Sequence, residues 1–136
     1  MNILADIGVI IFFVASAAIF FYFWRKFKKK GLRPDQLQYI KAHWIRIIDA
    51  FDSHSQQAVM DADKLLDYAL KCYGYEGHLG EKLKVAKGRF SDLDGVWSAH
   101  KLRNTLAHEL VQLSKDDGRR ALRQFKQALN DLGAKL

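Results

Sequence analysis

The sequence feature that most constrains this chain is a long apolar run at positions 3–24, which contains a single charged residue, Asp6. An α-helix rises about 1.5 Å per residue, so a helix of roughly 22 residues crosses a hydrocarbon core about 30 Å thick. Aromatic residues at 20–24 and basic residues at 25–30 follow, whereas positions 1 and 2 carry no side-chain cation. A secretory signal peptide has the opposite order, with its positive charge before the apolar run. The pattern therefore predicts a single transmembrane helix over residues 1–24.

The basic residues also predict the orientation of this helix. Lys and Arg beside a transmembrane helix stay on the cytoplasmic side, so we expect the N-terminus outside and the bulk of the chain in the cytoplasm. Residues 25–34 then form a basic juxtamembrane linker, whose charges could also bind anionic lipid headgroups. Residues 35–136 are long enough for one compact domain.

The rest of the chain is close to neutral. Of the formal net charge of +7, the segment 25–30 supplies five positive charges. From residue 31 onward there are 17 basic and 14 acidic residues, a net charge of +3. The high pI therefore reflects the juxtamembrane cluster and not a strongly basic nucleic-acid-binding face. Cys72 is the only cysteine, which excludes an intramolecular disulfide and a CxxC metal motif.

Beyond residue 33 the apolar residues recur at spacings of three and four, which is typical of amphipathic helices, and no stretch alternates with the period of a strand. We predict an all-α fold: a small bundle of four main helices and one short helix. The predicted helices span about 34–52, 56–73, 79–89, 94–110 and 117–132.

The same pattern predicts burial and caps at particular positions. Ile48, Val85 and Leu110 fall among the residues available to the core, and Asp61, Asp63 and Asp67 fall on a solvated face. An S-x-x-D spacing at 91–94 and again at 114–117 predicts N-terminal caps for the last two helices.

One short segment, 99–109, combines Arg, Asn and two His with apolar residues. If it is helical, His100, Asn104 and His108 share a face, and Arg103 lies beside His100. The planar guanidinium of Arg matches a phosphate, and a His can give or take a proton near neutral pH. The alternative is a structural network, in which Arg103 pairs with an acid such as Asp61 or Asp63 and the other polar side chains bond between helices.

The spacing of the remaining candidate ligands argues against a metal site. His43, His54 and His78 occur singly, and no His pair has the i, i+4 spacing of a helical zinc site. We therefore expect no metal and no cofactor, and we expect Cys72 to pack against apolar neighbours.

The segment 103–108, Arg-Asn-Thr-Leu-Ala-His, resembles the R-N-x-x-x-H motif of HEPN domains. These are small helical bundles found in prokaryotic toxins, CRISPR effectors and other defence proteins. Residues 58–67 also resemble the central helix of the family, and the likeness covers about residues 35–135. It implies a prokaryotic protein, with the domain on the cytoplasmic side of the inner membrane.

The resemblance implies metal-independent RNA cleavage at a composite site in a homodimer, in which the 2′-hydroxyl attacks its own phosphate and leaves a cyclic phosphate. Arg103 would bind the scissile phosphate, His108 would act as general acid or base, and Asn104 would orient one of them. His100 and Lys101 are weaker candidates for substrate binding. An antitoxin or another defence protein would be a natural partner.

Two other functions remain open. The first is a non-catalytic, membrane-anchored HEPN-like adaptor that binds a nucleotide or a partner protein, because a net charge of +3 gives the domain little electrostatic attraction for long RNA. The second is a purely structural membrane protein, whose bundle stabilises an assembly.

Overall fold

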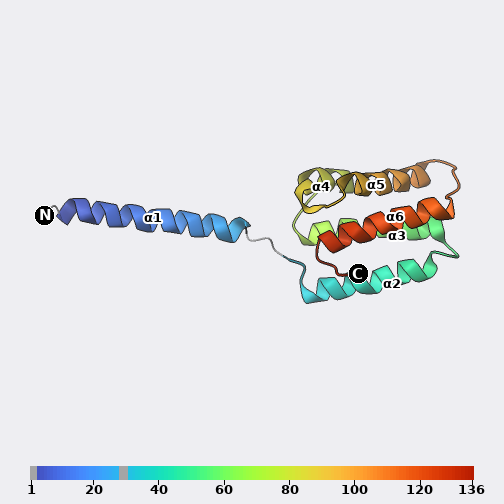
Figure 1. Ribbon diagram of the computed structural model, residues 1–136, viewed down its shortest axis with the longest axis horizontal. Helices are drawn as coiled ribbons and strands as arrows, with labels where there is room; N and C mark the ends of the chain where they lie inside the picture. Colours follow the sequence, from blue (N-terminus) through green and yellow to red (C-terminus); the bar gives the residue numbers. More distant parts are fainter. Residues whose placement is uncertain (1–2, 28–30) are drawn as a thin grey trace. The chain divides into compact units, whose positions relative to one another are not determined.

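The computed structural model describes residues 3–27 and 31–136, and these two ranges contain six α-helices, one short 3-10 turn and no strand (Figure 1). The all-α prediction is therefore confirmed. Residues 31–136 form a compact unit separate from the N-terminal helix. Part of the predicted basic linker, residues 28–30, lies outside the described residues.

Helix α1 spans Ile3–Phe27 and ends three residues beyond the predicted boundary, so Arg25 continues the helix. Its segment Asp6–Arg25 is long and apolar enough to cross a membrane, a property that N-terminal signal sequences share. The large apolar side chains described in this helix are exposed within the chain itself.

The remaining helices form a bundle: α2 (Pro34–Ala50), α3 (Ser55–Cys72), α4 (Leu79–Val85), α5 (Leu93–His108) and α6 (Lys115–Asp131), with the 3-10 turn at Lys87–Arg89. Helices α3 and α6 lie in the middle, with α2 on one side and α4 and α5 on the other (Figure 1). The helical periodicity accounts for the core, because the inward stripe of each helix meets its neighbours. The largest fully buried side chains are Phe125, Ile40, Leu66, Leu70, Leu83, Leu129 and Leu132.

The two capping predictions have different outcomes. Ser114 caps α6 as predicted, and its hydroxyl accepts a hydrogen bond from the Asp117 amide at 3.1 Å. Helix α5 is instead capped by Asp92, whose carboxylate accepts a hydrogen bond from the Gly95 amide at 2.9 Å. Ser91 donates to Asp131 of α6, so its assignment as the cap of α5 was wrong.

Four predictions of burial are also wrong. Val85 is 73% exposed, and Ile48 is exposed as well. Leu110 is fully exposed because α5 ends at His108, two residues earlier than predicted. Conversely, Asp63 is not solvated but only 4% exposed, because its side chain is directed towards α5.

Candidate functional site

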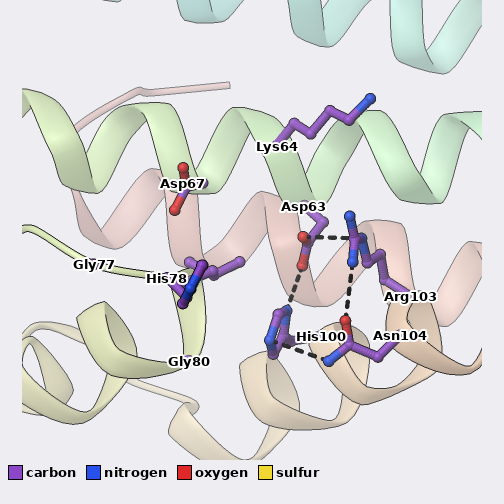
Figure 2. Close-up of a pocket in the computed structure, with 10 residues that line it drawn as sticks. Asp63, Lys64, Asp67, Gly77, His78, Gly80, His100, Arg103 and Asn104 are labelled. Carbon is purple, nitrogen blue, oxygen red and sulfur yellow. Dashed lines mark hydrogen bonds and ion pairs between the residues drawn. The ribbon is translucent and has the colours of Figure 1, made fainter. Parts of the chain in front are cut away.

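A polar pocket of about 420 Å³ lies where α3, the turn before α4, and α5 meet (Figure 2). Helix α3 contributes three residues on one side, and α5 contributes three, of which Arg103 and Asn104 belong to the segment that resembles the HEPN motif. The turn before α4 closes the third side, and the positive φ of Gly77 (93°) permits its sharp reversal. The lining residues are Asp63, Lys64, Asp67, Gly77, His78, Leu79, Gly80, His100, Arg103 and Asn104.

The buried carboxylate of Asp63 joins α3 to α5 at the base of this pocket. One oxygen accepts a hydrogen bond from His100 Nδ1 at 2.7 Å, and the other lies 3.4 Å from Arg103 Nε. A carboxylate withdrawn from water is stable only with such partners, because its own desolvation is costly. Asp63 therefore fixes the positions of two side chains from the candidate segment.

Arg103, Asn104, His100 and Asp63 form a closed ring of polar contacts, which we call the polar ring (Figure 2). Arg103 can only donate, so the Asn104 atom that its Nη1 meets at 3.0 Å is the amide oxygen.

The orientation of Asn104 in turn fixes the tautomer of His100. The Asn104 amide nitrogen faces His100 Nε2 at 3.3 Å, so Nε2 accepts a hydrogen bond. The imidazole is then neutral, with its proton on Nδ1, where it is donated to Asp63.

The guanidinium of Arg103 is not fully used by the polar ring. Its Nε is buried and has no hydrogen-bond partner, since Asp63 lies at ion-pair distance. The side chain as a whole is 25% exposed and lines the pocket. An anion that entered the pocket would find donors of a fixed cation there.

The opposite wall depends on a second ion pair. Lys82 of α4 is 4% exposed and donates to Asp67 of α3 at 2.8 Å. The His78 amide, at the start of α4, donates to Glu81 at 2.9 Å. Lys64 stands at the rim, mostly exposed, with Asp61 at 3.8 Å. Asp63 is thus paired with Arg103, and Asp67 is paired with Lys82. Lys64 is more exposed than either of these two cations.

The structure brings together three of the five candidate residues, Arg103, Asn104 and His100. His108 is exposed at the last turn of α5, does not line the pocket, and makes no hydrogen bond or ion pair within residues 3–27 and 31–136. Lys101 is likewise exposed and does not line the pocket. One copy of the chain therefore does not place Arg103 and His108 in the same pocket.

Several residues of the pocket were not expected from the sequence. Asp63 and Asp67 were considered only as carboxylates of which one could pair with Arg103, and His78 and Lys64 were not connected with the site at all. Their separation along the chain gives no local signal, since His100 and its acceptor are 37 positions apart.

No group of three or more His, Cys, Asp or Glu side chains that could hold a metal ion occurs in the described part of the chain. The chemistry available in the pocket is that of a fixed guanidinium, a neutral imidazole, an amide and an exposed ammonium. No family model, curated protein or solved structure matches this chain.

Proposed function

We propose that this protein is a membrane-tethered, HEPN-type ribonuclease that cleaves RNA without a metal ion. The observation that carries the proposal is the position of Arg103 and Asn104, which line an open polar pocket while Asp63 orients the guanidinium from behind. A guanidinium directed at a developing phosphate charge is a large source of catalysis, about 3–4 kcal/mol for a single donor.

The proposed reaction uses two copies of the chain. Arg103 of one copy binds the scissile phosphate, Asn104 orients the guanidinium through its 3.0 Å hydrogen bond, and His108 of the second copy exchanges the proton. The 2′-hydroxyl oxygen attacks the adjacent phosphorus, the bond to the 5′-oxygen breaks, and a cyclic phosphate and a 5′-hydroxyl result. A second copy is required because His108 lies outside the pocket that Arg103 lines.

The test is cleavage of a fluorescent RNA by the full chain in detergent with EDTA present. Arg103→Ala and His108→Ala should abolish cleavage, whereas His54→Ala, at another exposed histidine, should leave it unchanged. Equal activity of wild type and both site variants would remove the proposal.

A mixing experiment tests the composite site. When Arg103→Ala and His108→Ala chains are unfolded, mixed and refolded together, a heterodimer contains one site with both native residues. Cleavage should therefore return in the mixture but in neither variant alone. A mixture as inactive as its components would exclude a site that combines Arg103 of one copy with His108 of the other.

The second candidate is a non-catalytic HEPN-like adaptor on the membrane that binds a nucleotide or a partner protein. It is favoured by the polar ring, since Asp63 already neutralises part of the Arg103 charge. It predicts that Arg103→Ala weakens ligand binding while no chain cleaves RNA under any condition. Specific RNA cuts by the wild-type chain would exclude it.

The membrane anchor and its orientation are part of the same proposal. α1 carries an apolar segment long enough to span a bilayer, followed in sequence by basic residues. The full chain should remain with membranes after alkaline extraction, and a protease added from the cytoplasmic side should degrade residues 31–136. Release of the chain into the soluble fraction would exclude the anchor.

A further inference from the structure

We propose that a second pocket, between α2 and α3, binds an unstacked base of single-stranded RNA beside the Arg103 pocket. Its volume is about 410 Å³, within the range of roughly 300–1,000 Å³ that is usual for small-molecule sites. The residues that carry the argument are Tyr39, His43, Arg46, Asp61, Lys64 and Tyr68. The choice of RNA rests on the proposed function, whereas the binding itself can be measured without any cleavage.

Three aromatic rings are in contact in this α2–α3 pocket. Tyr39 and His43 are stacked, with ring centroids 3.9 Å apart and an interplanar angle of 28°. Tyr39 also contacts Tyr68 of α3 at 4.5 Å and 38°. Tyr39 nevertheless remains 44% exposed, so the cluster is not withdrawn into the core. Accessible aromatic rings are the surfaces on which proteins stack the bases of single strands.

His43 offers a hydrogen-bond acceptor to such a base. Its Nδ1 lies 2.9 Å from the backbone carbonyl of Tyr39, which can only accept, so Nδ1 carries the proton. In the neutral imidazole Nε2 is then an acceptor, for which no partner occurs in residues 3–27 and 31–136. The amino groups of adenine, cytosine and guanine are donors that could use it.

Arg46 supplies a cation one turn beyond His43. It lines the pocket, is exposed, and makes no hydrogen bond or ion pair within the described ranges of the chain. A guanidinium in this state can bind a phosphate without first breaking an internal contact.

Lys64 connects the two pockets, because it lines both of them. Within residues 3–27 and 31–136 its one acid contact is Asp61 at 3.8 Å, a long and exposed pair that contributes little stability. Asp61 also accepts a hydrogen bond from Gln57 at 2.8 Å, so it keeps a partner if Lys64 turns towards a ligand. If one base of an RNA strand occupied the α2–α3 pocket, the adjacent phosphate would lie beside Lys64, and the backbone would continue towards Arg103.

The test measures the fluorescence anisotropy of a labelled single-stranded RNA with the full chain in detergent, in a His108→Ala background to prevent cleavage. Tyr39→Ala should weaken binding roughly 5- to 100-fold, as the loss of one stacked base predicts. Tyr39→Phe keeps the ring and should retain the affinity. Arg46→Gln should lower the slope of log K against log salt by about one.

Matched controls are Ile45→Ala, an exposed residue of the same helix outside the pocket, and Arg123→Gln, an exposed cation on α6. Both should bind RNA like the parent chain. Helix content and thermal unfolding of each variant, followed by circular dichroism, separate a loss of binding from a loss of fold.

Three results would overturn the inference. One is equal affinity of Tyr39→Ala and its parent for the single strand. Another is equal affinity of the parent for duplex RNA, whose bases stay stacked and cannot enter the pocket. The third is loss of binding to anionic phospholipid vesicles, and not to RNA, on the same substitutions. If the wild-type chain bound single-stranded RNA as expected but did not cleave it, the nuclease proposal would be excluded and the proposed base-binding pocket would stand.

Discussion

Asp63→Ala removes the carboxylate that contacts both His100 and Arg103, and we expect it to lower the free energy of unfolding by about 2–4 kcal/mol. Removing one partner of a fully buried ion pair costs roughly 3–5 kcal/mol. The electrostatic contribution of the Asp63–Arg103 pair is smaller than that of a fully buried pair, because the Arg103 side chain is 25% exposed and its Nε lies 3.4 Å from the carboxylate. The lost 2.7 Å hydrogen bond from His100 adds to it.

The assay is urea and thermal unfolding of the full chain in detergent, followed by circular dichroism. For a domain of roughly 100 residues each kcal/mol lowers Tm by about 4–8 °C, so we expect a fall of about 8–32 °C. Asp61→Ala is the matched control on the same helix. Its pair with Lys64 is long and exposed, so the cost should stay within about 0.5 kcal/mol.

A double-mutant cycle identifies the partner. Asp63→Ala and Arg103→Ala should be coupled by about 1–3 kcal/mol, because each removes the same ion pair. An Asp63→Ala chain as stable as wild type, or a cycle without coupling, would refute the argument that the polar ring fixes α5 against α3.

Three further predictions concern single features of the bundle. Asp92→Ala should lower the thermal stability by about 1 kcal/mol, since it removes the N-terminal cap of α5. Gly118→Val should cost about 1–3 kcal/mol in urea unfolding, because a Cβ there lies 2.9 Å from Phe51 Cε2, whereas Gly88→Ala, with open space, should be nearly neutral. Burial raises the pKa of Tyr68 above its usual value of 10.0, so the phenol signal that is lost in Tyr68→Phe should appear above that pH in an ultraviolet titration. Because the folded pKa exceeds the unfolded one, the stability from this group is complete below pH 10.0 and is lost as the pH rises further.

The helices were predictable because each apolar stripe recurs at the helical period, as in the segment that became α3. Their ends were less predictable. The hydrophobic pattern continued through Leu110, but α5 stops at His108, where the backbone of Glu109 becomes extended. Val85 fits the pattern of its helix, yet α4 is only seven residues long and exposes one side, which a periodicity cannot anticipate.

The site was predictable only as a segment. The types and spacing of Arg103, Asn104 and His100 placed them together on one helix, and in the structure these three side chains line one pocket. Which of them faces inward depends on Asp63, an acid whose neighbours in sequence resemble those of any surface carboxylate. The packing of α3 against α5 determines which side chains face inward, and no local sequence pattern indicates that packing.

Helix α4 has a consequence for access to the Arg103 pocket. A helix of seven residues has no stability of its own in water, so α4 persists only through Leu79, Leu83 and the Lys82–Asp67 pair. Such a segment opens locally at a lower free energy than the long helices around it. Its amide protons should therefore exchange with solvent before those of α3 and α5. We therefore expect the wall that limits the width of the pocket to detach more easily than α3 and α5.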